Sequence, residues 1–499
     1  MVPQPPPQPG SAPLPPPPYP YGAYPPYYPV PYPPPSPRRG RGLQVVVGAI
    51  VVAAVVVTAA VGLLLRVNDA IVPPGTGGPL RIGTVLSITG GLAAFGGKNR
   101  QGVIMAVEEI NAAGGVLGQP IQLFHQNDDT KPETARSAAA TLVSQNHVDA
   151  IVGATGSGQC ATVIEVAKAN GVFEISGSCT SPRFSNATVG GGWWARTVPS
   201  DALQGVVAAS YALRNLTYSR AAVIAVRTVY GLGVGEMFAD SFIRFGGTLT
   251  APLRSIDEIV SPPTSYSVDL QAVLNTNPPP QLLYVVAYPP EGVQLVRDFE
   301  AGKSANPQWA NVRLMFSEGV FDQASFVDVL RNPPNNIDTS GFLGTAPAAY
   351  AGIVGPGHAA WADAYAARWG SQPGMFDDNN YDAAYVLALA AEAAGDSSGA
   401  AIRSKIRDVT NAPGTRIHAG EWAKARAEIA SGHDIDYEGA SGSVELDAVG
   451  DPTGAYAIWG VDGAGRLETR DVFPESLVIA LLPTPPMPAP PIAPTRGRH

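Results

Sequence analysis

The chain has 499 residues, of which 45% are hydrophobic and only 15% are charged, with 55 glycines, 50 prolines and two cysteines. This length exceeds a single ordinary core and indicates two lobes or domains with accessory segments. The net charge of −9 argues against a nucleic-acid-binding surface, which would need a concentrated basic face. No nucleic-acid partner is therefore expected.

Both ends of the chain are rich in proline. Residues 1–42 open with prolines and interleaved tyrosines, and residues 483–499 read PTPPMPAPPIAPTRGRH. Because proline fixes φ and removes a backbone donor, both tails favour polyproline II or disorder over helix and sheet. The first tail could be a ligand for SH3- or WW-like modules, or a sticky aromatic tail. A solvated spacer is the simpler interpretation.

Residues 43–65 form an uncharged run, LQVVVGAIVVAAVVVTAAVGLLL. As a helix this run would span about 34 Å, enough for a hydrocarbon core of about 30 Å. A cleaved signal peptide is the alternative, but its apolar region is normally about 7–15 residues and lies near the N-terminus. Arg38, Arg39 and Arg41 precede the run, so the positive-inside rule places the first tail in the cytoplasm. We expect a single-pass anchor in the cytoplasmic (inner) membrane, with the folded part periplasmic or extracellular.

Residues 66–79 are expected to be a flexible linker, which leaves residues 80–482 as the folded part. There, short apolar runs alternate with stretches of helical periodicity. The predicted strands are Arg81–Ile88, Ile121–Phe124, Val148–Val152, Val172–Ser176, Ala221–Val226, Leu282–Ala287 and Val312–Phe316. The predicted helices are Lys98–Asn111, Pro132–Gln145, Gln159–Ala169 and Glu291–Ala301. Such alternation predicts an α/β fold with parallel sheets covered by helices.

The loops that follow these strands are the candidate site, because open parallel sheets bind ligands beyond the carboxyl ends of their strands. They carry small hydroxyl residues, three aromatic rings and one acid: Ser157, Ser178 and Thr180; Phe95, Tyr230 and Tyr288; and Glu318. Hydroxyls and free N–H groups at helix N-termini suit a carboxylate. The rings suit an apolar side chain, and the acid suits an ammonium group. The sequence thus predicts a small amino-acid-like ligand.

Each candidate also has a plain structural explanation. Ser157 and Thr180 could be helix caps, an aromatic residue after a glycine-rich loop could be a lid over the core, and Glu318 could be a solvated loop carboxylate. Cys160 and Cys179 could form a disulfide in an exported compartment if neighbouring strands bring them together. Two buried free thiols are the alternative.

Chemical motifs of enzymes are missing from the sequence. The six histidines lack metal-ligand spacing, so no metal or other cofactor is predicted. The segment 231–235 lacks the lysine of a phosphate-binding loop, and 155–159 lacks the outer glycines of a nucleophile elbow. We expect a protein that binds a ligand and performs no reaction on it.

Several segments together resemble a known family. They are IGTVLSITGGLAAFGGKNRQGVIMAVEEINAAGGVLGQPIQL, NDDTKPETA, ISGSCTSP, Tyr230-Gly231, AYPPEG and SEGV. The chain is similar over about residues 80–465 to the type I periplasmic binding proteins of the Leu/Ile/Val-binding group, substrate-binding components of ABC importers. The resemblance implies two Rossmann-like lobes joined by a hinge that closes on the ligand. Lobe 1 would comprise about 80–199 and 348–457, and lobe 2 about 200–347 and 458–482.

The resemblance also implies roles for the candidate residues. Ser157 and Thr180 would hold the ligand carboxylate, and the Ser178 carbonyl, the Thr180 hydroxyl and the Glu318 carboxylate would hold the ammonium. The three aromatic candidates would line the cleft. Phe95 stands where tyrosine is common, which removes a polar contact, and Ser178 stands where alanine is usual.

The implied function is capture of an amino acid, branched-chain or otherwise apolar, for an ABC importer whose permease is the expected partner. A ligand-sensing receptor of the same fold that signals through its anchor is the alternative. A receptor would be expected to carry a cytoplasmic output domain, which 42 proline-rich residues do not provide. Amides, urea and short carboxylates are alternative ligands.

Overall fold

The computed structural model describes residues 78–259, 265–348 and 356–482, all within one compact unit, Ile71–His499. Both proline-rich tails, the expected membrane helix at 43–65 and nearly all of the linker lie outside the described residues. Within the described ranges, no helix combines the length and the apolarity that crossing a membrane requires.

The first of two large sheets has five parallel strands in the order β2-β1-β3-β4-β5. They are β1 Arg81–Leu86, β2 Gln122–Asn127, β3 Ala150–Gly153, β4 Phe173–Ser176 and β5 Trp194–Arg196. Its main helices are α2 Ala93–Ala112, α3 Pro132–Ser144, α4 Ser157–Ala169, α12 Asp377–Ala394 and α13 Gly399–Lys405. We call this sheet with its helices lobe 1.

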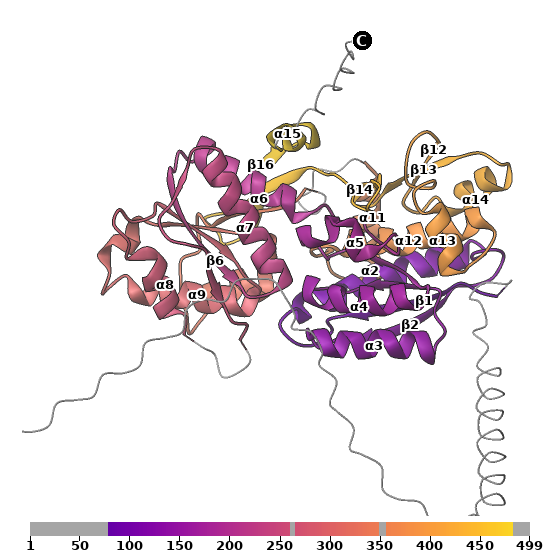
Figure 1. Cartoon of the computed structure of the whole chain (residues 1–499), viewed down its shortest axis with the longest axis horizontal. Coiled ribbons are helices and arrows are strands. Elements are labelled where there is room, and N and C mark those ends of the chain that lie inside the picture. The colour runs from indigo at the N-terminus through magenta and orange to yellow at the C-terminus, as the bar shows by residue number, and fades with distance from the viewer. Residues whose placement is uncertain (1–77, 260–264, 349–355, 483–499) are drawn as a thin grey trace, which may run out of the picture. The chain divides into compact units, whose positions relative to one another are not determined.

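Helices bury both faces of this sheet. In β3, Ala150 and Val152 pack in one apolar cluster with α2 and α12, whereas Ile151 packs in another with α3 and α4. Successive side chains of a strand point to opposite faces, so a strand covered on both sides, such as β3, is apolar at successive positions. Figure 1 shows the orange α12 beside the indigo α2, although the two helices are far apart in the sequence.

The second sheet has eight strands in the order β16-β15-β11-β10-β9-β6-β7, and β8 also pairs with β6. The strands are β6 Arg220–Val226, β7 Thr248–Leu249, β8 Arg254–Ile256, β9 Leu282–Val286, β10 Arg313–Phe316, β11 Leu343–Pro347, β15 Tyr456–Val461 and β16 Leu467–Phe473. Its helices are α6 Asp201–Ser210, α7 Val229–Arg244, α8 Ser267–Leu274, α9 Pro289–Gly302 and α15 Glu475–Leu481. We call this sheet with its helices lobe 2.

The remaining elements are short or peripheral. They include the helices α5 Ala187–Gly190, α10 Asp328–Arg331, α11 Pro356–Trp369 and α14 Trp422–Ala430, and a small sheet of β12 Thr415–His418, β13 Ile435–Gly439 and β14 Gly442–Ser443.

The predicted α/β fold with parallel sheets is confirmed, with two corrections. The sheet of lobe 2 is mixed, because β15 runs antiparallel to both β11 and β16. The turn between β15 and β16 is too short for a crossover, so these two strands form a hairpin. Helix α2 begins at Ala93 instead of Lys98, and this places Phe95 in its first turn.

Two glycines in the first turns of α2 explain why the sequence predicted the start of this helix too late. Glycine disfavours helix in general, and Gly96 with Gly97 therefore reads as a loop. In the structure, a Cβ at Gly96 would collide with the carbonyl of Ser87, and one at Gly102 would collide with the carbonyl of Asp377. Close packing of α2 against the end of β1 and the start of α12 thus requires these glycines.

A buried ion pair joins separate parts of lobe 1. Arg196, at the end of β5, is fully buried, and its Nε and Nη2 each donate to a carboxylate oxygen of Asp451 at 2.7 Å. Its Nη1 donates to the carbonyls of Cys179, at 3.1 Å, and Ser181, at 3.0 Å. The guanidinium therefore fixes the loop after β4 to the segment before β15.

Replacing Asp451 tests this contact. Asp451→Ala leaves a buried guanidinium without its counter-ion, so the free energy of unfolding should fall by about 3–5 kcal/mol. Urea denaturation followed by circular dichroism measures the change. The control is Glu108→Ala, which breaks an exposed pair with Arg368 and should cost less than about 1 kcal/mol. Equal losses in the two variants would contradict the assignment.

Candidate ligand-binding site

A cavity of about 30 Å³ lies where loops after the strands of both lobes meet. All seven residues predicted to bind a ligand line it: Phe95, Ser157, Ser178, Thr180, Tyr230, Tyr288 and Glu318. The other lining residues are Leu92, Thr155, Gly156, Gly319, Met375 and Phe376. The volume corresponds to about two water molecules, so the two sides of the cavity are nearly closed on each other.

Lobe 1 contributes two adjacent loops with hydroxyl groups. Ser157 is the first residue of α4, and its Oγ accepts from the backbone N–H of Ser181 at 3.3 Å. The Ser178 hydroxyl donates to the carbonyls of Ala154 and Thr155, both at 3.0 Å. The Ser178 hydroxyl is therefore engaged within the protein, which suits the prediction that only the backbone of this residue meets the ligand.

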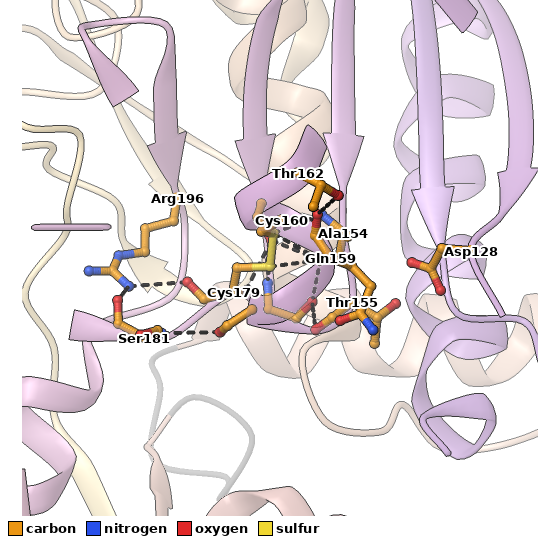
Figure 2. The surroundings of a disulfide bond; sticks show 12 residues. Asp128, Ala154, Thr155, Gln159, Cys160, Thr162, Cys179, Ser181 and Arg196 are labelled. Carbon is orange, nitrogen blue, oxygen red and sulfur yellow. Dashed lines mark hydrogen bonds between the residues drawn. A yellow bond between two sulfur atoms is a disulfide. The ribbon is translucent and has the colours of Figure 1, made fainter. Parts of the chain in front are cut away.

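A disulfide joins these two loops, as Figure 2 shows. Cys160 lies in the first turn of α4, three residues after Ser157, and Cys179 lies between Ser178 and Thr180. Both cysteines are fully buried, and the N–H of Ala154 lies 2.9 Å from the sulfur of Cys160. The disulfide thus links the two backbone segments that form the lobe 1 side of the cavity.

Lobe 2 contributes an acid and two stacked rings. Glu318 follows β10 at the start of a short helical turn, Glu318–Val320, and is buried. The amide nitrogen of Gln204 donates to a Glu318 oxygen at 2.5 Å. The rings of Tyr230 and Tyr288 stack with centroids 5.4 Å apart. The Tyr230 hydroxyl donates to Ser317 at 2.8 Å and accepts from the N–H of Gly319 at 3.1 Å.

A second acid, Asp201, lies close to Glu318. Burial raises the pKa of Glu318 to about 7, against the hydrogen bond from Gln204. Burial also raises the pKa of Asp201 well above its usual range, and the negative charge of Glu318 adds to this shift. A hydrogen bond with Thr180 and the Arg196 guanidinium oppose it. The end of the cavity at Glu318 therefore disfavours negative charge and suits a ligand that brings a positive one.

Sequence reasoning missed Asp201 because the residue follows Ser200, whose side chain caps α6, and the pattern reads as an ordinary helix start. Asp201 and Gln204 lie three residues apart in α6, and residues at this spacing share one helix face. That spacing is the sequence signal from which a role for Asp201 beside Gln204 could have been predicted.

Met375 and Phe376, which also line the cavity, were missed as well. Both precede α12, and no motif marks them. Phe376 adopts left-handed backbone angles, φ 68° and ψ 11°. Such a conformation costs a non-glycine residue about 1–2 kcal/mol. Strained backbone conformations of this kind are found more often at ligand-binding sites than elsewhere in proteins.

No three or more His, Cys, Asp or Glu side chains in the described ranges are grouped to hold a metal ion. The site consists instead of hydroxyl-bearing loops, a pair of acids and an apolar wall. Pockets for small organic molecules typically combine an apolar wall with a few polar groups in this way.

Residues 79–428 match the periplasmic binding protein family, and the chain belongs to this family. Within it, the relatives and the fold identify a type I protein of the Leu/Ile/Val-binding group. Members of this family bind solutes without performing a reaction on them.

Two curated relatives illustrate the similarity. The chemotactic signal transduction system substrate-binding protein BasB of Halobacterium salinarum is 27% identical over 422 residues, which cover 80% of this chain and 90% of BasB. The Leu/Ile/Val-binding protein homolog 3 of Brucella melitensis is 31% identical over 169 residues, which cover 34% of this chain. The second match spans less than half of that relative, 45%.

Solved structures show the same fold. A leucine-binding protein LivK from Thermotoga maritima gives a TM-score of 0.64 at 22% identity, over 80% of this chain and 99% of that one. The substrate-binding protein LivJ of a branched-chain amino-acid transporter from Streptococcus pneumoniae, in complex with isoleucine, gives 0.61 at 20% identity, over 80% and 100%.

Removing the disulfide tests its contribution. Its cysteines are 19 residues apart, and a cross-link over such a loop stabilises a fold by about 3 kcal/mol, chiefly by restricting the unfolded chain. The double variant Cys160→Ala/Cys179→Ala should lose about this free energy of unfolding, measured by guanidinium denaturation. A reducing agent should destabilise the unaltered protein similarly and leave the double variant unchanged. An unaltered protein insensitive to complete reduction would contradict the prediction.

Proposed function

We propose that this solute-binding protein captures a small apolar amino acid for an ABC importer. One observation carries the proposal: a single cavity brings the hydroxyl-bearing loops of lobe 1 to face the acid and rings of lobe 2. An amino acid has a negative end, a positive end and a side chain, and each has a chemically suited region in this cavity.

The carboxylate of the ligand would lie at the start of α4, near Ser157 and Thr180. The helix N-terminus offers free N–H groups and a favourable dipole there. The ammonium would lie against Glu318 and the carbonyl of Ser178. The side chain would face the apolar wall that includes Phe95, which offers no hydroxyl.

Transport would follow from closure of the lobes. A cavity of about 30 Å³ is too small for an amino acid, so the lobes must part to admit one and would then close to a form with a larger cavity than the present one. Contacts to both lobes would stabilise the closed form, which a permease would recognise. Residues 43–65 would hold the protein at the outer face of the cytoplasmic membrane, with residues 1–42 inside.

Sensing is the second candidate function, and the similarity to BasB favours it. BasB is a chemotactic substrate-binding protein, and its match to this chain covers 80% of the residues. Both functions use the same clamp and differ in the membrane partner. Co-purification of a permease and ATPase would support import, whereas co-purification of a transducer would support sensing.

Replacing Glu318 tests the ammonium contact. Glu318→Gln keeps the shape of the side chain but removes its charge, so affinity for amino acids should fall about 10–100-fold, as expected for a lost charged hydrogen bond. Calorimetric titration with leucine, isoleucine, valine and alanine measures this change. Glu165→Gln, at an exposed ion pair with Arg136, is the control and should bind normally. Unchanged affinity in Glu318→Gln would exclude the ammonium contact and favour amides or short carboxylates.

Binding should also release protons. Burial raises the pKa of Glu318 from 4.5 to about 7, so the free protein keeps this acid protonated between these values. An ammonium ligand favours the carboxylate, so affinity should rise with pH through this window and level off above it. Titrations at pH 6 in buffers of different ionisation enthalpy measure the release. Proton uptake would contradict the prediction.

Without ligand, the same shift affects stability. An acid with a raised pKa in the folded state binds its proton more tightly than in the unfolded chain. The contribution of Glu318 to stability is therefore fully present below pH 4.5 and lost as the pH rises through about 7.

A further inference from the structure

The guanidinium of Arg196 contacts the backbone on both sides of Thr180. Its Nη1 donates to the carbonyl of Cys179 at 3.1 Å and to the carbonyl of Ser181 at 3.0 Å, and Figure 2 shows the three residues together. Thr180 lines the cavity of the candidate site, whereas Arg196 is fully buried and is not among the lining residues. Arg196 therefore acts on the cavity through the loop that it holds.

The contact with Cys179 sets the direction of a hydrogen-bond donor in this loop. The carbonyl of Cys179 and the N–H of Thr180 belong to one trans peptide group, in which the two point in opposite directions. Because the carbonyl points toward Arg196, the N–H of Thr180 points away from it. No atom of the described residues accepts a hydrogen bond from this N–H. Buried N–H groups without an acceptor are rare, and a ligand carboxylate would supply one.

The next peptide group of the loop is held at both ends. The carbonyl of Thr180 accepts from the N–H of Asp201 at 2.8 Å, and the N–H of Ser181 donates to the hydroxyl of Ser157 at 3.3 Å. Ser157 also lines the cavity. The position of the loop thus depends on Arg196, at the end of β5, and on Asp201, at the start of α6.

The orientation of the guanidinium is itself determined, because all five of its N–H donors are used. Besides the two bonds from Nη1, Nε and Nη2 each donate to an oxygen of Asp451 at 2.7 Å, and Nη2 donates to the hydroxyl of Ser185 at 3.0 Å. Arginine carries five donors in a rigid planar fork, whereas lysine carries three on a compact rotating group. A lysine at this position would therefore keep the charge and lose the set of directed contacts.

Asp451 lies on a segment that connects the two lobes. The segment runs from Leu446, which packs in an apolar cluster of lobe 1, to β15 in the sheet of lobe 2. Arg196 ends β5 of lobe 1, and the chain then enters α6 of lobe 2. The ion pair therefore links two connections between the lobes to the peptide group that precedes Thr180.

We propose that Arg196 is a positioning residue for the recognition of a ligand carboxylate. It holds the carbonyl of Cys179, so that the N–H of Thr180 is directed at the carboxylate, and Asp451 keeps the guanidinium in the orientation that this requires. A charged donor on the carbonyl also polarises the peptide group and makes its N–H a stronger donor. The inference rests on the proposed function, because it requires a ligand that carries a carboxylate.

Comparing an amino acid with its amide tests this role. The amide keeps the ammonium group and the side chain but lacks the negative charge of the carboxylate. Calorimetric titration of the full-length protein at pH 6 uses the amino acid that binds tightest among leucine, isoleucine, valine and alanine, and then its amide. The ratio of the two dissociation constants should be at least about ten in the unaltered protein, since a charged hydrogen bond contributes about tenfold or more. In Arg196→Lys the ratio should fall below about three.

This ratio does not respond to stability alone, because both ligands bind the same folded form. Arg220→Lys is the matched control: it alters a bond from Arg220 Nε to the carbonyl of Pro279, outside the cavity lining, and should keep the unaltered ratio. An unaltered ratio in Arg196→Lys would overturn the role of Arg196 and leave the proposed function standing. Equal binding of amino acid and amide by the unaltered protein would overturn the carboxylate contact. Binding of none of the four amino acids would overturn the proposed function and this inference with it.

Ser185→Ala decides the question if circular dichroism shows that Arg196→Lys does not fold. This variant removes a hydroxyl that contacts both the guanidinium and Asp451, and it keeps the ion pair itself. Looser orientation of the guanidinium should lower the ratio about twofold. An unchanged ratio in folded Ser185→Ala would then overturn the inference.

Discussion

In a parallel sheet every strand delivers its carboxyl end to the same edge, and this constraint determines where the site can form. β3 and β4 end beside each other in lobe 1, so the loops with Ser157 and Thr180 are neighbours. β9 and β10 end beside each other in lobe 2, which places Tyr288 near Glu318. Because the two edges face one cavity, residues more than 200 positions apart in the sequence, such as Phe95 and Glu318, line the same small space.

Two buried acids, Glu318 and Asp201, determine which charge the cavity favours. Glu318 and Asp201 are both buried, burial raises the pKa of each, and the negative charge of Glu318 raises the pKa of Asp201 further. Gln204 and Thr180 support the acids with hydrogen bonds and do not neutralise them. Burial therefore raises the pKa of both acids, which favours their protonated forms, and a positive charge in the cavity would act against this shift.

The sequence allowed much of this site to be predicted, because position after a strand is a local signal. Ser157, Thr180 and Glu318 each lie two to four residues after the end of a strand, and the parallel arrangement brings such positions together. Met375 and Phe376 follow no strand and depend on how α12 packs across α2, a contact between distant segments that no local pattern encodes. The antiparallel β15 was missed for a similar reason, since pairing with β11 is decided by the completed sheet.

The close approach of α2 and α12 limits how this cavity can change in evolution. At Gly102 the two backbones touch without an intervening side chain, so the helices cannot slide past each other by small steps. Related proteins that keep this contact would adapt to new ligands by exchanging the side chains that project from a fixed frame, at positions such as 95, 375 and 376. Selectivity in such a lineage would then diverge by discrete substitutions, while the scaffold around the pocket stays superimposable.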